Sequence, residues 1–250
     1  MKEFVIMEEI FDVAVLGATA LGCGIAFEGG GRTILIDEGV TLCADYTRTL
    51  RPMTLKGSGL LADELRKRGL VGRGVSTPAL DGIMCGLLKD SGAKLLLCCR
   101  PASIDRAGGH FEVEYFGVNG FRKIIARNVI DTRAHSGKVR FNLICARIFG
   151  DIRLEHCEGF EVSPGGFEEE AFLTLPDGSL TDALGRFYSG ASVLPEGWKI
   201  AAAAQETDLR GLTGISRRDG VIFDQSAAYE DADIAFEEGR KCFTDVLKIV

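Results

Sequence analysis

The residues whose types and spacing point most clearly to chemistry lie within the first 40 positions. Gly17, Thr19 and Gly22 form the pattern G-x-T-x-x-G directly after the apolar run 11–16. A glycine turn between a buried strand and a helix presents the backbone N–H groups of the helix N-terminus, and these groups bind phosphate. Asp37 follows 20 residues after Gly17, where a carboxylate accepts hydrogen bonds from ribose hydroxyls. The spacing predicts a nucleotide-binding turn.

Two of these positions leave alternatives open. The usual pattern has glycine where Thr19 stands, because glycine lets the backbone approach a pyrophosphate. Thr19 either caps the helix or contacts phosphate through its hydroxyl, or it marks a glycine lost because no ligand comes near. Asp37 and Glu38 either bind ribose or form the solvated end of a strand. A carboxylate at Asp37 disfavours the 2′-phosphate of NADP.

Hydrophobic periodicity predicts the elements that must position this turn. Strands are expected at 11–17, 33–37, 94–99 and 128–132, and helices at 25–28, 60–65, 80–88 and 231–243. Residues 103–126 alternate with period two around Gly108-Gly109 and Asn119-Gly120, which predicts a three-stranded antiparallel meander. The loop-rich, alternating segment 138–195 predicts a small insertion of strands.

The predicted fold class is therefore α/β: a Rossmann-like domain with a parallel sheet of the dinucleotide-binding kind, a three-stranded antiparallel meander and a small β-rich insertion. The expected domains are residues 1–137 together with 196–250 for the Rossmann-like part, and 138–195 for the insertion. The insertion would lie over the ligand cleft on the substrate side.

The order of elements and several motifs resemble the FAD-dependent oxidoreductases with a glutathione-reductase-like flavin domain. The family's fingerprint, G-x-G-x-x-G-x-x-x-A/G, appears at 17–26, and the strand 129–132 resembles the one before its A-T-G motif. Residues 220–224 resemble its G-D motif, which meets the ribityl and phosphate groups of the flavin. Residues 235–240 resemble its closing helix. The resemblance covers residues 10–132 and 215–250.

The resemblance implies FAD as cofactor and flavin-mediated transfer of a hydride or electrons on a small substrate. Electrons would come from that substrate or from a redox partner protein. The implied cofactor-binding residues are Gly17, Thr19, Ala20, Leu21, Gly22, Asp37, Glu38, Ala102, Thr132 and Asp224.

Several positions depart from the family where it keeps glycine. The departures are Thr19, Cys43, Ala44, Arg133 and Phe223. Each adds a side chain beside the expected cofactor. Two alternatives therefore stay open beside the flavin enzyme. One is a degenerate, non-catalytic member that has lost FAD and acts as a binding or subunit protein. The other is an NAD or adenine-nucleotide binder that uses only the first strand-turn-helix unit and Asp37.

Two histidines are the candidate general acids or bases, by location alone. His135 follows the strand that would end beside the flavin ring, and His156 lies in the insertion that would face it. Neither has an identifiable partner in the sequence. Cys23 fits core packing better than a reactive thiol, and Cys98-Cys99 is expected to point to opposite faces of a strand.

Composition excludes several classes. The 250 residues are 46% hydrophobic and carry a net charge of -7, with no cluster of basic residues, so neither nucleic acid nor a membrane surface is an expected partner. No apolar run approaches about 20 residues, the length that spans a membrane. The eight cysteines include no C-x-x-C pair, and no metal site is expected. An acidic N-terminus unlike a signal peptide predicts a cytoplasmic protein. The positive mean hydropathy, +0.13, hints at a homo-oligomer surface.

Overall fold

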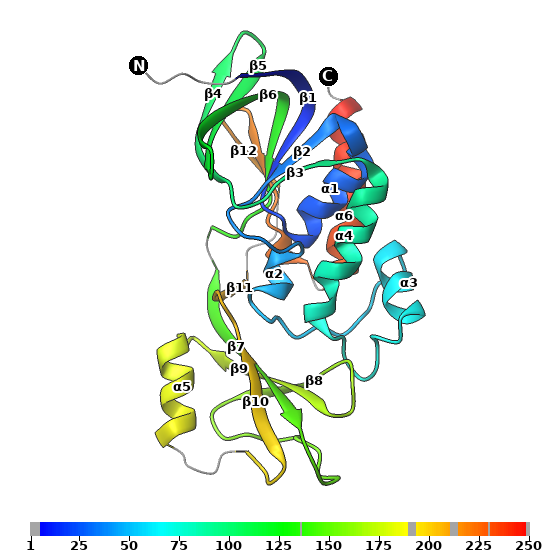
Figure 1. Ribbon diagram of the computed structural model, residues 1–250, viewed down its shortest axis with the longest axis vertical. Helices are drawn as coiled ribbons and strands as arrows, with labels where there is room; N and C mark the ends of the chain where they lie inside the picture. The colour runs from blue at the N-terminus through cyan, green and yellow to red at the C-terminus, as the bar shows by residue number, and fades with distance from the viewer. Residues whose placement is uncertain (1–5, 136, 190–193, 211–214, 230, 249–250) are drawn as a thin grey trace.

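The computed structural model describes residues 6–135, 137–189, 194–210, 215–229 and 231–248, which form two units stacked along the long axis (Figure 1). The strands are β1 (Ile6–Leu16), β2 (Thr33–Ile36), β3 (Lys94–Leu96), β4 (Arg100–Ala107), β5 (His110–Gly117), β6 (Gly120–Asp131), β7 (Lys138–Arg147), β8 (Glu161–Pro164), β9 (Glu170–Pro176), β10 (Trp198–Ala203), β11 (Asp208–Arg210), β12 (Ser216–Arg218) and β13 (Val221–Phe223). The helices are α1 (Ala20–Gly29), α2 (Ala44–Thr47), α3 (Leu60–Lys67), α4 (Leu80–Ser91), α5 (Leu180–Ser189) and α6 (Ala232–Lys248), with short 3₁₀ turns η1 (Gly30–Arg32), η2 (Thr77–Ala79) and η3 (Ser226–Ala228).

The first unit, at the top of Figure 1, is built on a sheet with the order β12-β13-β6-β1-β2-β3. Neighbouring strands from β13 to β3 run parallel, whereas β5 pairs antiparallel with β6, and β4 with β5. The end of β1, from Val13 to Leu16, is fully buried, because a parallel strand is covered on both faces and reads as a continuous apolar run. The predicted Rossmann-like sheet with an antiparallel meander is confirmed.

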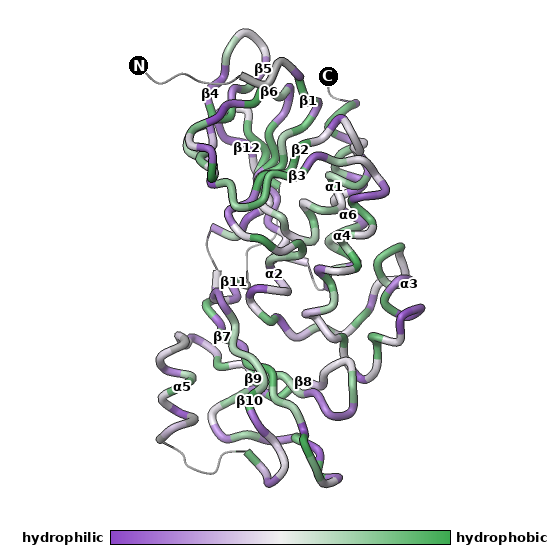
Figure 2. Tube along the Cα trace, viewed as in Figure 1, coloured by the Kyte–Doolittle hydropathy of each residue, from purple (hydrophilic) through white to green (hydrophobic). Residues whose placement is uncertain are grey.

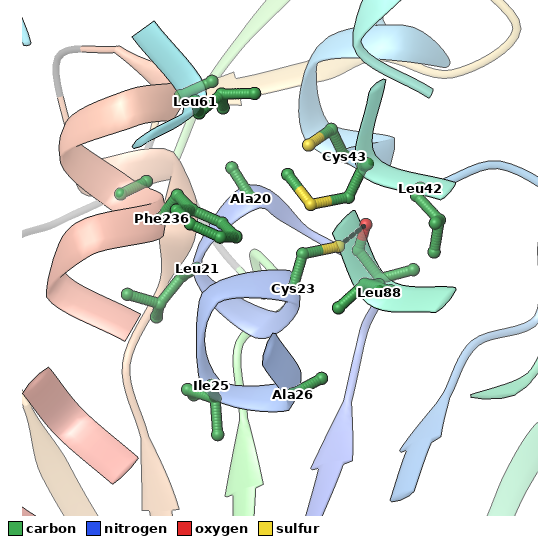
Figure 3. Packing of buried hydrophobic residues seen from close by; sticks show 14 of the residues in the cluster. Ala20, Leu21, Cys23, Ile25, Ala26, Leu42, Cys43, Leu61, Leu88 and Phe236 are labelled. Atoms are coloured by element: carbon green, nitrogen blue, oxygen red, sulfur yellow. Dashed lines mark hydrogen bonds between the residues drawn. The ribbon is translucent and has the colours of Figure 1, made fainter. Parts of the chain in front are cut away.

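Helices α1, α4 and α6 cover one face of this sheet, and the meander covers the other. Helices α1 and α6 touch through their backbones: a side chain at Gly24 would collide with the carbonyl of Phe236. Figure 3 shows the core on the helical side, where Leu21 and Ile25 of α1 lie beside Phe236. Cys23 is buried in the same core, as packing predicts. Figure 2 shows the apolar strands of the sheet.

Three predicted strands differ from the observed ones. The strands expected at 121–126 and 128–132 are one strand, β6, whose first part pairs with the meander and whose second part pairs with β13. β1 pairs with β6 from Lys123 to Asp131, with one register shift between Ile6 and Ile10, so β6 continues through the point where its sequence pattern changes. The strand expected at 94–99 ends at Leu96, because the chain turns at Cys98, whose φ is 55°. Cys98 and Cys99 therefore do not alternate along a strand, which corrects that expectation.

The second unit is an antiparallel sheet with the order β10-β7-β9-β8, to which β11 adds beside β7. Its apolar core includes Phe141, Phe172 and Trp198, which are nearly inaccessible to solvent. Strands β10 and β11 follow residue 195, so the sheet extends to residue 210, past the expected end of the insertion. The expected return to the first unit at 196 rested on local pattern, which does not reveal that these strands pair with β7.

Direct hydrogen bonds join the two units. Asn142 of β7 is fully buried and donates its side-chain amide to the carbonyl of Thr49 at 2.8 Å. The backbone N–H of Gln205 donates to the carbonyl of Arg48 at 2.8 Å. The second sheet is therefore fixed against the segment 48–51 of the first unit, and this segment borders the cleft described next. Over the residues described, no helix is long and apolar enough to cross a membrane.

Candidate functional site

A cleft of about 270 Å³ lies where the carboxyl ends of β2 and β6 meet the start of α1. Its other walls are the segment 44–51 and residues 206–209, which approach from the second unit. In open parallel sheets, ligands bind in the crevice outside the carboxyl ends of the strands. Thr19 of the predicted nucleotide turn lines this cleft, so the location of the cleft agrees with the fold.

The predicted turn forms as a compact set of hydrogen bonds. Thr19 is the N-cap of α1: its hydroxyl accepts a hydrogen bond from the N–H of Gly22 at 3.1 Å and donates to the hydroxyl of Thr132 at 2.7 Å. Gly17 has a φ of 103°, a conformation that suits glycine. The structure thus brings Gly17, Thr19, Gly22 and Thr132 together, and of the alternatives for Thr19 it shows the helix cap.

The first free N–H groups of α1 are bound by side chains of the chain itself. The N–H of Ala20 donates to Oδ1 of Asp45 at 2.9 Å, and the N–H of Leu21 donates to Oγ of Ser226 at 3.1 Å. Ser226 in turn donates to Oδ2 of Asp45 at 2.7 Å. Burial raises the pKa of Asp45, although Arg51 and these hydrogen bonds act in the opposite direction. A carboxylate therefore occupies the place where a helix N-terminus would receive phosphate.

Asp37 ends β2 and is 3% exposed. Its Oδ2 accepts the N–H of Ala18 at 2.8 Å, and its Oδ1 accepts the N–H of Gly39 at 2.7 Å and Nη2 of Arg48 at 3.1 Å. Both oxygens are therefore engaged by protein donors. Glu38, the next residue, is exposed at the mouth of the cleft.

Asp131 ends β6 and collects a second group of donors. Arg133 binds it in a bidentate manner, with Nε at 2.9 Å from Oδ1 and Nη2 at 2.7 Å from Oδ2. These hydrogen bonds raise the pKa of Arg133. Nε2 of His135 lies 3.1 Å from Oδ2 of the same carboxylate. The stem of Arg133 also lies over Gly17, because a Cβ there would be 2.6 Å from Cγ of Arg133. This arginine covers the turn on its cleft side.

Arg51 forms the floor of the cleft and is 1% exposed. Its Nε donates to Oδ1 of Asp208 at 2.8 Å, its Nη2 donates to the carbonyl of Leu209 at 3.2 Å, and its Cζ lies 4.9 Å from the ring centroid of Tyr46. Burial alone would lower the pKa of Arg51, but Tyr46 and the carboxylates of Asp208 and Asp45 raise it. The guanidinium is therefore a fixed positive charge that links the two units.

Three residues of the predicted site lie elsewhere. Asp224 accepts the hydroxyl of Tyr229 at 3.2 Å and does not line the cleft, and burial raises its pKa. Ala102 is exposed on β4 at a register shift between Pro101 and Ser103. His156 is exposed in the second unit and does not line the cleft. Of the two candidate histidines, only His135 is at the cleft.

Sequence reasoning missed four charged residues that line the cleft, namely Asp45, Arg48, Arg51 and Glu206, and also Ser226, which binds the start of α1 behind it. A signal existed for some of them: Asp45 directly follows the Cys43-Ala44 departure, and two arginines stand within four positions at 48–51. Cys43 itself adopts the left-handed conformation, with a φ of 50°, at a position where the family has glycine. Among the described residues, no group of three or more histidine, cysteine or acidic side chains is arranged to hold a metal ion.

No family model matches the sequence, and no curated protein matches it either. Solved structures do. A geranylgeranyl bacteriochlorophyll reductase-like protein from Thermoplasma acidophilum matches with a TM-score of 0.68 at 12% identity, over 98% of this chain and 80% of that one. Glycine oxidase from Geobacillus kaustophilus matches with a TM-score of 0.67 at 15% identity, over 96% of this chain and 95% of that one. A flavoprotein/dehydrogenase from Cytophaga hutchinsonii matches with a TM-score of 0.58 at 13% identity, over 96% of this chain and 78% of that one. At these identities the likeness shows a shared fold with oxidoreductases.

The residues of the cleft do not fit FAD. The pyrophosphate would have to displace Asp45 from Ala20 and Ser226 from Leu21, and it would meet a carboxylate of like charge. The ribose hydroxyls would have to compete for Asp37 with two backbone N–H groups and Arg48, which already donate to its two oxygens. The cleft, at about 270 Å³, also falls just below the range of about 300–1,000 Å³ that holds drug-sized ligands.

Proposed function

We propose that this chain is a binding protein on a flavin-type fold that holds no FAD. The observation that carries this proposal is Asp45, whose carboxylate takes the N–H of Ala20 and the hydroxyl of Ser226 at the start of α1. The free N–H groups at the start of α1 need acceptors, and Asp45 and Ser226 supply them without a ligand. The helix N-terminus is therefore satisfied by the chain itself, as expected for a member that has lost the flavin and keeps the fold for binding.

Electrostatics support this proposal. A pyrophosphate beside an ionised Asp45 would meet like charges in a partly buried site, and such juxtapositions cost several kcal/mol. Moving Asp45 away would leave the N–H of Ala20 without its acceptor until the ligand replaced it. Arg133 adds a steric obstacle, because its stem lies over Gly17. The same obstacles apply to NAD, whose adenosine would also require the engaged carboxylate of Asp37.

The test is a titration of the purified chain with FAD, followed by desalting and a visible spectrum, with ADP binding measured by calorimetry. We expect the native protein to retain no flavin. The variant Asp45→Gly removes the internal anion, and we expect it to bind ADP at least about tenfold more tightly than the native protein, which corresponds to about 1.4 kcal/mol. Asp63→Asn, on the exposed face of α3, is the matched control for loss of a carboxylate. A native protein that keeps stoichiometric FAD overturns the proposal.

A second candidate is the FAD-dependent oxidoreductase that the motifs imply, acting by hydride or electron transfer on a small substrate. Its support is the fold likeness to an oxidase and to a flavoprotein/dehydrogenase over nearly the whole chain. In that function Asp45 and Arg133 would leave the turn when FAD enters. A retained flavin band in the spectrum favours this candidate and would justify a search for its substrate and electron acceptor.

A further inference from the structure

The floor of the cleft contains buried donors without partners. In the part of the chain that the structure describes, Nη1 of Arg51 has no hydrogen-bond partner, although the side chain is 1% exposed. Nε of Arg48, on a side chain that is 13% exposed, also lacks one. Both arginines line the same cleft. Buried polar groups are nearly always satisfied, and neither nitrogen is accessible to solvent in this structure, so a ligand's acceptor reaches them when the side chains around the cleft move.

The charges around these donors limit what that acceptor can be. Arg51 lies against Asp208 and near Asp45, and Arg48 contacts Asp37, so each arginine already has an acidic neighbour. A multiply charged group such as a diphosphate would meet these acids as well. A single carboxylate matches the unused donors better, because a guanidinium binds one carboxylate in a planar arrangement.

The mouth of the cleft has the opposite preference. Glu206 and Glu38 are about half exposed there, and Glu206 lies 2.9 Å from Nη1 of Arg48. Burial raises the pKa of Glu206, Arg48 acts in the opposite direction, and Asp37 and Glu38 raise it further. Crowded carboxylates favour a cation beside them. The cleft thus has unpartnered guanidinium nitrogens on Arg48 and Arg51 and, at its mouth, two carboxylates that each have one arginine neighbour, Arg48 for Glu206 and Arg100 for Glu38.

We infer that the cleft binds a small zwitterion, a free α-amino acid, with its carboxylate on Arg51 and its ammonium group toward Glu206 and Glu38. This inference rests on the proposed function, because a bound FAD would fill the same space. The volume of about 270 Å³ suits a molecule of this size. The lining carries three arginines, which are Arg48, Arg51 and Arg133, against Asp37, Glu38, Asp45 and Glu206, so a ligand that carries both signs complements it better than one of either sign.

The experiment is an NMR titration of the flavin-free, ¹⁵N-labelled chain with each of the common amino acids. The best binder is then compared with the acid that lacks its amino group and with the amine that lacks its carboxyl group. We expect shifts at Arg48, Arg51 and Glu206, and binding of each fragment at least about tenfold weaker than that of the amino acid. Absence of shifts for every amino acid, or equal binding of one fragment, overturns the inference.

Variants separate the two ends of the ligand. Glu206→Gln removes a carboxylate from the mouth. We expect this variant to bind the amino acid more weakly and to bind its deaminated analogue with unchanged affinity. Glu169→Gln, which removes a somewhat more exposed carboxylate that pairs with Arg147 outside the cleft, is the control. Arg51→Lys keeps the charge and removes the free Nη1, so we expect weaker binding of both the amino acid and its deaminated analogue. If Arg51→Lys does not fold, Glu206→Gln still decides, because unchanged amino-acid binding in that variant contradicts the inference.

The two proposals fail in different ways. A yellow native protein overturns the proposed function, whatever the amino-acid titration gives. A colourless protein that rejects FAD and also shows no amino-acid shifts overturns only the ligand proposed here.

Discussion

The turn at the start of α1 and the floor of the cleft border the same space, yet they differ in how their polar groups are satisfied. At the turn, the N–H groups of Ala20 and Leu21 are taken by Asp45 and Ser226. At the floor, Arg51 is buried to a similar degree and still keeps one nitrogen without a partner among the described residues. A motif therefore predicts where donors lie, but only the surrounding side chains decide whether those donors are available to a ligand.

The difference follows from the geometry of the donors. Two backbone N–H groups need only one short acidic side chain and one hydroxyl, and Asp45 lies close enough in the chain to supply the first. A guanidinium has five N–H donors in a fixed fork, so one carboxylate and one carbonyl cannot use them all. Arg51 donates to Asp208 and Leu209 through Nε and Nη2, which leaves its buried Nη1 without a partner among the described residues.

The largest expected effect comes from breaking the pair at the floor. Asp208→Ala leaves the buried guanidinium of Arg51 without its carboxylate, and removal of one partner of a buried pair costs about 3–5 kcal/mol. We expect the free energy of unfolding in urea to fall by that amount. The control is Arg51→Met combined with Asp208→Leu, which removes both charges and should be much closer to the native protein. A loss below about 1 kcal/mol for Asp208→Ala would show that the floor is not a fixed charge.

The turn should respond less strongly, because its hydrogen bonds are neutral or distributed over several groups. Thr19→Ala removes the cap on Gly22 and the bond to Thr132, and we expect a loss of about 1–2 kcal/mol in the free energy of unfolding. Ser179→Ala is the matched control, since Ser179 accepts the N–H of Asp182 in the same manner on an exposed part of the second unit. Equal losses for both variants would mean that Thr19 does no more than cap a helix.

Much of the fold was predictable because local patterns determine it. The buried strand, glycine turn and helix at 11–29 form as their spacing predicts, and Thr132 meets the turn because parallel strands end at one edge of a sheet. The long strand β6 was not predictable as one element. Its first half pairs with β5 and its second half with β13, so the hydrophobic pattern changes near Arg127 and predicts two strands instead of one.

The contents of the cleft were harder to predict because they come from distant parts of the chain. Ser226 accepts the N–H of Leu21 across 205 residues of sequence. Glu206 lies between β10 and β11, in a segment that the sequence pattern assigns to the first unit. Asp224 stands where the family's motif places it in sequence, but it pairs with Tyr229, whose single hydroxyl lies 3.2 Å from both of its oxygens. Sequence spacing predicts where a strand ends, but the hydrogen-bond partner of each side chain depends on the residues that pack around it.

The smallest expected effect is a change of stability with pH that reports the charge at the turn. Burial raises the pKa of Asp45 from the value of 3.8 of the unfolded chain, so its ionisation destabilises the folded state. Stability from this group is fully present below pH 3.8 and is lost as the pH rises through the raised pKa. Asp45→Asn keeps the acceptor for Ala20 without the charge, so its free energy of unfolding should rise relative to the native protein from pH 4 to pH 7. Urea unfolding at each pH measures this difference. A difference of the opposite sign would mean that α1 and Arg51 lower the pKa of Asp45 in the folded state. An ionised Asp45 would then repel phosphate from the turn more strongly than burial alone predicts.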